Sequence, residues 1–266
     1  MKPDPDDIVR IAELAGRAIM EVYGRPGPPA STAKADSSPL TEADMAAHEA
    51  IVSELLELQP SCPIVSEEGL VGDPGASEHS WLVDPMDGTK EFIKRNGMFT
   101  VNIALMRREG ERWKPTFGVV HAPASGRTWF GGAGCEPKLA TEGESRPIGV
   151  AAEHEGPVRV ANSITHRHHK DEAFAESLGG HEAVPVGSSL KACMVADGSV
   201  DLYPRFGPTN CWDIAAAHAV VQAAGGDVFG PDGRSLDYAL VGDTLNPPFM
   251  VASGEKWNHL WIGAQG

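Results

Sequence analysis

The chain has 266 residues, enough to bury a large core, and this length suits one large domain or two packed lobes. Lys and Arg number 22 against 37 for Asp and Glu, which gives a formal net charge of -15. Such a charge repels polyanions, so it argues against a nucleic-acid polymer or an anionic membrane as partner and leaves room for a small anionic substrate.

The cysteines and the N-terminus bear on the compartment. Four cysteines are scattered along the chain without a C-x-x-C pair, which excludes a zinc ribbon and a thioredoxin-type motif. The first residues are acidic and Pro-rich, so no signal peptide is visible, and no apolar run approaches membrane-spanning length. We expect a reduced, cytoplasmic protein with no transmembrane segment. Its oligomeric state stays open.

The N-terminal segment predicts a helix followed by a loop. Apolar residues recur at helical spacing over residues 8–22, after two aspartates and before Gly24. Residues 25–39 are rich in Pro, Gly, Ala and Ser, which indicates a loop able to move and close over a site.

A second helix follows this loop. Thr41-x-x-Asp44 resembles a capping box, in which two side chains satisfy the free backbone N–H groups of a helix start. The helix is predicted to run through Leu58. Asp44 then lies in its first turn, held on a rigid element.

Short apolar or alternating segments predict a sheet in the first half of the chain. The predicted strands are Pro63–Ser66, Trp81–Val83, Phe99–Leu105, Phe117–His121 and Arg127–Phe130. A Gly-, Glu- and Pro-rich stretch near residues 143–157 follows. We therefore expect an N-terminal α+β lobe over residues 1–150 and a C-terminal α/β lobe over residues 151–266.

In the second half, strands and helices alternate. The predicted strands are Val158–Ala161 and Ala183–Val186, and the predicted helices are Lys170–Leu178, Ser189–Ala196 and Cys211–Ala224. The last of these helices is stopped by two glycines and has Asp213 in its first turn, where a negative charge favours the helix dipole.

Carboxylates stand at the ends of several of these elements. Asp84 and Asp87 follow a short apolar strand, Glu67 follows another, and Asp213 opens a helix. Oxygen-only ligand sets suit hard cations such as Mg²⁺, which completes its coordination with water and phosphate oxygens. The pattern favours a metal-dependent phosphate-ester hydrolase. Lys90, next to Lys94 and Arg95, would supply a basic island for an anionic substrate.

Plainer interpretations exist for each acid taken alone. Asp-Pro and Asp-Gly pairs are common in surface turns, Glu67 could sit at a solvated strand end, and Asp213 could serve the helix dipole only. The presence of all these acids at the ends of predicted elements favours a metal site over the separate explanations. Spacing excludes an EF-hand, an aspartyl-phosphate phosphatase, a P-loop and a serine nucleophile elbow. The cluster of His166, His168 and His169 is interpreted as surface, because it lies in a polar loop.

Longer strings carry a family resemblance. Ser66-Glu67-Glu68, the segment from Asp84 to Thr89, and Trp212-Asp213 resemble the three signatures of the Mg²⁺-dependent, lithium-sensitive inositol monophosphatase superfamily. Within it, residues 88–97 and 202–210 resemble the CysQ-type 3′(2′),5′-bisphosphate nucleotidases. The resemblance extends from about residue 39 to the C-terminal strand.

The resemblance implies a fold and an activity. The fold would be a layered αβαβα sandwich of the α+β or α/β class. The reaction would be hydrolysis of adenosine 3′,5′-bisphosphate to AMP and phosphate, in sulfur assimilation. Inositol phosphates and sugar bisphosphates remain alternative substrates for the same kind of metal site. Relatives that associate peripherally with the inner membrane make that location an alternative to a purely cytoplasmic one.

The resemblance also implies roles for individual residues. Two or three Mg²⁺ ions would be bound, Asp84 would bridge two of them, and Li⁺ and Ca²⁺ would inhibit. The metal ligands would be Glu67, Asp84, the backbone carbonyl of Met86, Asp87 and Asp213. Met86 departs from the Leu or Ile that is usual in the family, but a carbonyl ligand depends little on the side chain.

Catalysis and substrate binding complete the expected site. Asp44 and Thr89, with Glu67, would orient and deprotonate the attacking water without a covalent enzyme intermediate. The backbone N–H groups of Gly88 and Thr89 would hold phosphate oxygens at the start of a short helix. The full set of expected substrate contacts is Glu67, Met86, Asp87, Gly88, Thr89, Lys90, Ser188, Lys191, Arg205 and Asp213.

Overall fold

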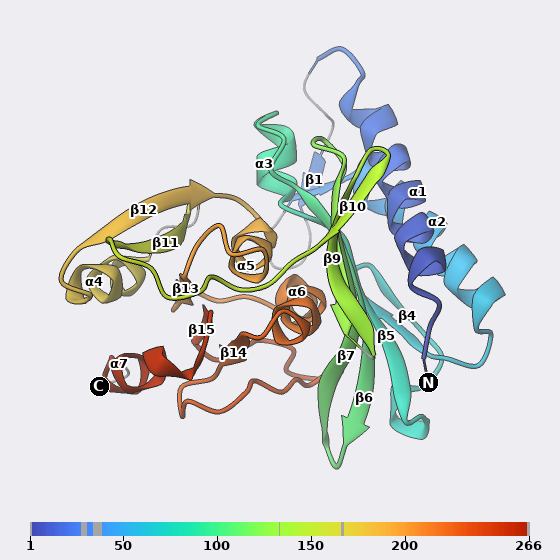
Figure 1. Cartoon of the computed structure of the whole chain (residues 1–266). Coiled ribbons are helices and arrows are strands. Elements are labelled where there is room, and N and C mark those ends of the chain that lie inside the picture. Colours follow the sequence, from blue (N-terminus) through green and yellow to red (C-terminus); the bar gives the residue numbers. More distant parts are fainter. Residues whose placement is uncertain (1, 28–30, 34–38, 133, 166–167, 265–266) are drawn as a thin grey trace.

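The computed structural model describes residues 2–27, 31–33, 39–132, 134–165 and 168–264. Its elements stack in five layers, helix, sheet, helix, sheet, helix, which confirms the expected sandwich (Figure 1). The first layer holds α1 (Pro5–Tyr23) and α2 (Glu42–Leu58), and the last holds α4 (His169–Ser177) and α7 (Asn258–Gly263). Both helices expected at the N-terminus are present, and Thr41 and Asp44 form the predicted capping box.

The larger sheet has eight strands in the order β10-β9-β8-β7-β6-β5-β3-β4. Neighbouring strands are antiparallel, except that β3 and β5 are parallel. The strands are β3 (Ile64–Ser66), β4 (Gly69–Val71), β5 (His79–Asp87), β6 (Thr100–Glu109), β7 (Arg112–Ala122), β8 (Arg127–Gly132), β9 (Cys135–Thr141) and β10 (Glu144–Pro147).

Both faces of this sheet are covered, and the alternation of side chains decides which residue meets which layer. On β5, Trp81 and Val83 belong to the core shared with α1 and α2. Leu82, between them, belongs to the core on the opposite face, which it shares with the middle helices. Asp84 follows in the same alternation, so it faces the middle layer of the molecule.

The smaller sheet has five strands in the order β12-β11-β13-β15-β14, with β11 parallel to β12 and β13. Its strands are β11 (Val158–Ser163), β12 (His181–Val186), β13 (Leu202–Arg205), β14 (Asp227–Phe229) and β15 (Phe249–Ala252). Between the two sheets lie α5 (Leu190–Ala196) and α6 (Cys211–Ala223) (Figure 1). Two single-turn helices, Pro74–Ala76 and Glu255–Trp257, complete the fold.

Helix α6 is buried along most of its length because it contacts both sheets. Its approach to β7 depends on a glycine. A Cβ atom at Gly118 would lie 2.0 Å from the backbone oxygen of Ala216 on α6. Glycine at this position therefore sets the distance between the larger sheet and the helix that carries Asp213.

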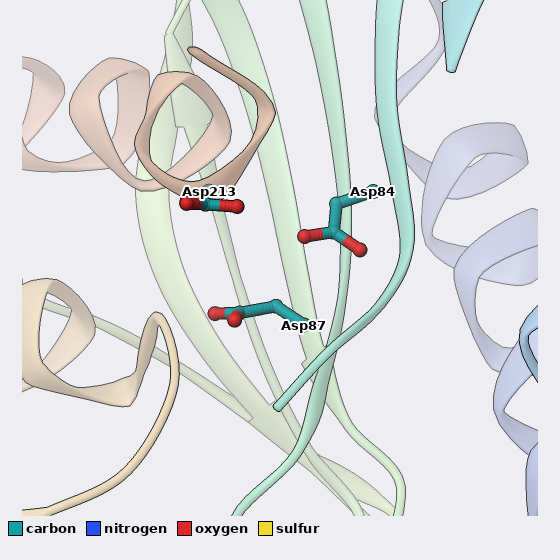
Figure 2. Close-up of side chains that lie close together, drawn as sticks. All are labelled: Asp84, Asp87 and Asp213. Carbon is teal, nitrogen blue, oxygen red and sulfur yellow. The ribbon is translucent and has the colours of Figure 1, made fainter. Parts of the chain in front are cut away.

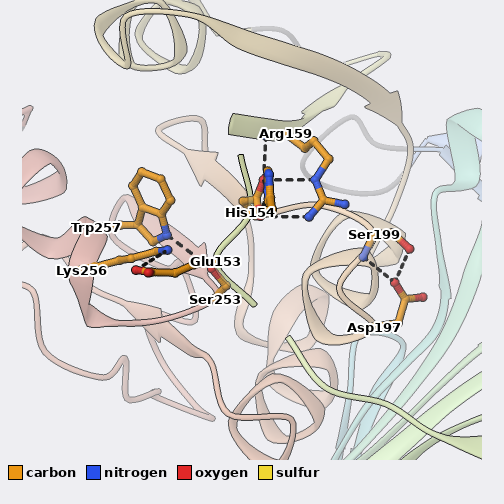
Figure 3. Close-up of polar contacts among 9 residues, drawn as sticks. Glu153, His154, Arg159, Asp197, Ser199, Ser253, Lys256 and Trp257 are labelled. Atoms are coloured by element: carbon orange, nitrogen blue, oxygen red, sulfur yellow. Dashed lines mark hydrogen bonds and ion pairs between the residues drawn. The ribbon is translucent and has the colours of Figure 1, made fainter. Parts of the chain in front are cut away.

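The segment that leads from β10 to β11 is anchored by the buried carboxylate of Asp201, the residue before β13. Asp201 accepts hydrogen bonds from the backbone N–H of Arg159 at 2.8 Å, from the Arg159 guanidinium and from His154 Nε2 at 3.0 Å. Figure 3 labels the two donor residues, Arg159 and His154. Burial acts to raise the pKa of Asp201, but the bonds from Arg159 outweigh it and the pKa is lowered. Lys256 lies 3.5 Å from Glu153 in the same segment.

Three sequence expectations need correction. The segment 25–39 contains a two-stranded pair, β1 (Ser31–Ala33) with β2 (Pro39–Thr41), although residues 28–30 and 34–38 lie outside the described part. No strand was predicted between Phe130 and Val158, yet β9 and β10 form a hairpin there, and their sequences carry little apolar alternation. Strand β5 also continues four residues beyond its predicted end.

The strands of the two sheets come from different halves of the chain, residues 64–147 and 158–252. The boundary between lobes at residue 150 itself stays a prediction. None of the described helices is long and apolar enough to cross a membrane.

A buried histidine should make the stability of the fold depend on pH. His121 on β7 is 7% exposed and shares a 2.8 Å hydrogen bond with Thr128, and burial lowers its pKa to about 4. The folded state therefore holds fewer protons than the unfolded state between about pH 4 and 6.5. The free energy of unfolding should fall by about 3 kcal/mol as the pH drops through this window.

Urea denaturation of wild type and of His121→Gln across this pH range checks this expectation. The variant should show a weaker pH dependence, since its side chain does not titrate. Substitution of the exposed His259 by Gln is the matched control, and the free energy of unfolding of this variant should stay within about 0.5 kcal/mol of wild type. If the free energy of unfolding changed equally with pH in wild type and in His121→Gln, the pH dependence could not be assigned to His121.

Candidate functional site

The first two acids of the site lie at an irregularity of β5. The pairing between β5 and β6 shifts between Asp84 and Asp87, and the backbone N–H of Met86 donates to Asp84 Oδ1 at 3.0 Å. The two acids thus lie within a bulged strand end, where a simple surface turn was the alternative. Gly88 follows with φ +94 and starts α3 (Thr89–Ile93), as expected; a Cβ there would lie 3.0 Å from the backbone oxygen of Met98.

Asp213 reaches the same place from the middle layer. It is the third residue of α6, and its Oδ2 accepts the backbone N–H of Asn210 at 2.8 Å in a capping box. One oxygen from each of Asp84, Asp87 and Asp213 lies within 4.8 Å of the others. Figure 2 shows the three carboxylates turned toward one space between β5 and α6.

The electrostatics of this cluster fit a divalent cation. Burial raises the pKa of Asp84 well above its usual range, and repulsion from Glu67, Asp87 and Asp213 adds to this effect. The pKa of Asp213 is raised in the same way, by burial first and then by Asp87. A cation among these oxygens would remove the repulsion, and an all-oxygen donor set is what Mg²⁺ and similar ions bind.

A cavity of ≈ 490 Å³ opens onto the cluster and gathers nearly all the residues that the sequence singled out. Of the expected metal ligands, catalytic residues and substrate contacts, Asp44 is the one that does not line it. The candidates that line it are Glu67, Asp84, Met86, Asp87, Gly88, Thr89, Lys90, Ser188, Lys191, Arg205 and Asp213. Residues from both sheets and from the middle layer therefore converge here.

Asp44 lies behind the cavity wall, in contact with a residue that forms it. The Thr89 hydroxyl donates to Asp44 Oδ1 at 3.3 Å, while Asp44 Oδ2 accepts the backbone N–H and the hydroxyl of Thr41, each at 2.7 Å. The carboxylate is 1% exposed. Asp44 can therefore take a proton from the cavity only through Thr89 or a group that replaces this contact.

Two buried cations share the cavity with the carboxylates. Lys191 is 5% exposed and Arg205 is 8% exposed. Lys191 donates to the backbone oxygen of Ser188 at 2.6 Å and lies over the ring of Tyr203. Burial lowers its pKa to about 8, partly offset by attraction to Asp87. Arg205 donates to the backbone oxygen of Pro208 at 3.1 Å.

The predicted basic island is divided. Lys90 lines the cavity, whereas Lys94 and Arg95 do not. Lys94 points to the hydroxyl of Thr165 at 3.4 Å, and Arg95 donates to the backbone oxygen of Tyr23 at 2.6 Å and lies over its ring. Helix α3 ends at Ile93, and Arg95 beyond it has φ +58, so the backbone leaves the helical path after Lys94 and adjacency in sequence does not place the three cations together.

Other residues of the site were missed from the sequence. His168 is half-buried and lines the cavity, so its interpretation as a surface residue is wrong, whereas His169 is exposed and His166 lies outside the described residues. Ser189 also lines the cavity, and Asn102 of β6 contacts Ser189. The alternation of residues 99–105 places Asn102 on the polar side of its strand, which predicts exposure, so no sequence signal marked it; in the structure both sides of this stretch are buried.

Comparisons with known proteins agree with this geometry. A family model described as the inositol monophosphatase family matches residues 6–260. The chain is 42% identical over 261 residues to the 3′(2′),5′-bisphosphate nucleotidase CysQ of Escherichia coli (strain K12), covering 93% of this chain and 98% of the relative. Identity to the same-named protein of Shigella flexneri is 44% over 261 residues, with the same two coverages.

A solved structure gives the same result in three dimensions. The crystal structure of CysQ from Bacteroides thetaiotaomicron, described as a bacterial member of the inositol monophosphatase family, superposes with a TM-score of 0.78 at 36% identity. The match covers 93% of this chain and 96% of that one.

Proposed function

The chain belongs to the inositol monophosphatase family, and from this premise we propose that it is a 3′(2′),5′-bisphosphate nucleotidase. It removes the 3′-phosphate of adenosine 3′,5′-bisphosphate, with AMP and phosphate as products, and so serves sulfur assimilation. The observation that carries the proposal is one cavity that joins three clustered carboxylates to two buried cations. A metal-bound phosphate at the carboxylates and a second anionic group at the cations describe a bisphosphate.

In this proposal the cofactor is Mg²⁺, two or three ions per site, with Li⁺ and Ca²⁺ as inhibitors. Glu67, Asp84, the carbonyl of Met86, Asp87 and Asp213 hold the ions. The closeness of Asp84, Asp87 and Asp213 and the raised pKa values of Asp84 and Asp213 support this role, and Glu67 and Met86 line the same cavity. Divalent cations supply the charge that makes water nucleophilic at neutral pH and that stabilises the oxygens of an in-line displacement.

The chain's own groups supply the rest of the reaction. Asp44 keeps the Thr89 hydroxyl oriented, so that the Thr89 oxygen can accept a hydrogen bond from the attacking water and pass its proton toward Asp44. The backbone N–H groups of Gly88 and Thr89, at the start of α3, face phosphate oxygens. Water attacks phosphorus directly, so no covalent enzyme intermediate forms.

The test is phosphate release from adenosine 3′,5′-bisphosphate in the presence of Mg²⁺. We expect the highest kcat/KM for this ester, compared with inositol 1-phosphate and fructose 1,6-bisphosphate. Addition of Li⁺ or Ca²⁺ should lower the rate. Absence of turnover would reject the proposal, and a higher kcat/KM for either comparison substrate would reassign the substrate while keeping the metal chemistry.

We also place the enzyme in the cytoplasm, and four cysteines without disulfides support this location. Peripheral association with a membrane has no support in the described residues and is not proposed.

Lys191→Met should weaken binding of the second phosphate of the substrate and leave binding of the 3′-phosphate largely unchanged. The KM for adenosine 3′,5′-bisphosphate should rise about 10- to 100-fold, the worth of a hydrogen bond to a charged group, while that for adenosine 3′-monophosphate changes little. Because the pKa of Lys191 is about 8, wild type should also lose affinity for the bisphosphate above this pH, and the variant should not.

Steady-state kinetics with the two substrates from pH 6.5 to 9.5 provide the measurement. Lys114→Met is the matched control, since this part-buried lysine donates to the backbone oxygen of Ser235 and does not line the cavity. An equal loss with both substrates in Lys191→Met would show that Lys191 acts on the structure of the site and not on the second phosphate.

A further inference from the structure

Two polar residues of β6 lie directly behind the carboxylate cluster. Thr100 pairs with Asp87, and Asn102 pairs with Asp84, across the β5–β6 ladder. Their exposed fractions are 0% and 1%. Two positions apart on one strand, they share a face of the sheet with Ala104, which packs against the middle layer.

The first contact chain runs from Thr100 through Ser188. The Ser188 hydroxyl lies 2.6 Å from Asp87 Oδ2 and 3.1 Å from the Asp87 backbone oxygen, and it lies 2.6 Å from the Thr100 hydroxyl. An ionised carboxylate and a backbone carbonyl only accept hydrogen bonds, so Ser188 donates to Asp87. Thr100 must then donate to Ser188.

The second contact chain runs from Asn102 through Ser189 to the same oxygen. Asn102 Nδ2 donates to the Ser189 hydroxyl at 2.7 Å, and that hydroxyl lies 2.7 Å from Asp87 Oδ2 and 3.0 Å from the Asp213 backbone oxygen. Asn102 Nδ2 is also 3.5 Å from the Trp212 backbone oxygen, an acceptor, which fixes which end of the amide faces this way. This second contact chain therefore connects β6 to the starts of α5 and α6.

Both contact chains end on Asp87 Oδ2, and neither ends on Oδ1. We propose that Thr100 and Asn102 are positioning residues: acting through Ser188 and Ser189, they hold the Asp87 carboxylate in the orientation that binds the divalent cation. This role rests on the proposed metal-dependent function. Carboxylate ligands that are oriented by outer hydrogen bonds bind metal more tightly than free ones, because less motion is lost on binding.

Two features indicate that these residues serve the site and not the stability of the fold. Ser188 has φ +56, a left-handed conformation that is unfavourable for serine. Asn102 Oδ1 is buried and has no hydrogen-bond partner among the described residues, which lowers stability. The strained backbone at Ser188 and the unpaired Asn102 oxygen are both expected if the geometry here serves to orient the Asp87 carboxylate.

Thr100→Val and Asn102→Leu test the proposal, since each removes the polar group and keeps most of the volume. Titration calorimetry with Mg²⁺ should show affinity reduced about 10- to 100-fold in each variant. The Mg²⁺ concentration that gives half-maximal phosphate release should rise in step, while KM for adenosine 3′,5′-bisphosphate at saturating Mg²⁺ changes little. Thr100→Ser keeps the hydroxyl and should bind Mg²⁺ as wild type does.

The metal-free proteins separate positioning from structure. In EDTA, Asn102→Leu should have a Tm equal to or above that of wild type. Thr128→Val is the matched control, because Thr128 is a buried threonine of the same sheet that bonds to His121 outside this cavity. It should lose stability and keep its Mg²⁺ affinity. Wild-type Mg²⁺ affinity in both Thr100→Val and Asn102→Leu would overturn the proposal.

A double substitution tests whether Thr100 acts through Ser188. In a Ser188→Gly background, where glycine suits the backbone conformation, Thr100→Val should cause no further loss of Mg²⁺ affinity. Additive losses would overturn the relay. The wild-type protein distinguishes failure of the proposed function from failure of the positioning role. Mg²⁺ binding without turnover of adenosine 3′,5′-bisphosphate would reject the proposed substrate and leave the positioning role unaffected. Absence of Mg²⁺ binding would reject both proposals.

Discussion

Asp84→Asn is expected to lower turnover of adenosine 3′,5′-bisphosphate by more than about 10³-fold, because it removes the most buried carboxylate of the proposed metal site. The same substitution should raise the Tm of the metal-free protein. In wild type without metal, folding buries this carboxyl close to Glu67, Asp87 and Asp213, and its pKa rises. An amide at this position has no charge to bury.

The sign of the pH dependence follows from the raised pKa. A carboxyl that holds its proton more tightly in the folded state stabilises the fold fully below its unfolded pKa, and this contribution is lost as the pH rises through the folded pKa. The metal-free wild type should therefore lose stability relative to Asp84→Asn as the pH rises from about 4. Added Mg²⁺ should restore the stability of wild type and leave the stability of Asp84→Asn unchanged.

Thermal unfolding in EDTA and in Mg²⁺, together with phosphate release, gives the measurements. Asp44→Asn is the informative comparison: it should lose about 10²- to 10⁴-fold in turnover, the usual contribution of a general base, and keep its Mg²⁺ affinity. A lower Tm for Asp84→Asn in EDTA, or residual turnover close to that of wild type, would contradict the assignment of Asp84.

Gly118→Ala should give the largest loss of stability, because the new methyl would lie 2.0 Å from the backbone oxygen of Ala216. Helix α6 cannot withdraw, since it packs on the smaller sheet as well. Overpacking of this kind typically costs about 1–3 kcal/mol, and we expect the upper end or beyond because both groups in the clash are backbone or directly attached to it. For a chain of this size, that is a fall in Tm of roughly 6–12 °C.

The variant should also bind Mg²⁺ more weakly, because a shift of α6 carries Asp213 away from Asp84 and Asp87. Gly69→Ala, in an exposed strand of the same sheet, is the matched control: its Cβ would lie 3.7 Å from the nearest atom, an ordinary contact. Its stability should stay within about 0.5 kcal/mol of wild type. Equal Tm values for the two variants would contradict the close approach at Gly118.

Local signals were enough to predict much of the site. The capping box at Thr41 and Asp44 depends on residues three apart, and the apolar run that ends at Asp84 is visible within the nine residues 81–89. The helix that carries Asp213 was predicted from its apolar run and its two terminal glycines. These features need no knowledge of the remainder of the chain.

Features that depend on distant contacts were not predictable in the same way. The bulge that extends β5 is defined by its pairing with β6, and the half-buried strand β9 and the exposed strand β10 are held by their neighbours rather than by apolar alternation. Asn102 and Ser189 are 87 residues apart, so neither could be connected to Asp87 from the sequence. His168 gained its place in the cavity only from the position of α4.

The middle layer sets limits on how this chain can be divided. Helix α6 comes from the second half of the sequence, yet it covers one face of the sheet built by the first half. A fragment that stopped near residue 150 would leave that apolar face open to water and would favour aggregation over independent folding. The two halves are therefore expected to be inherited, expressed and lost as one unit.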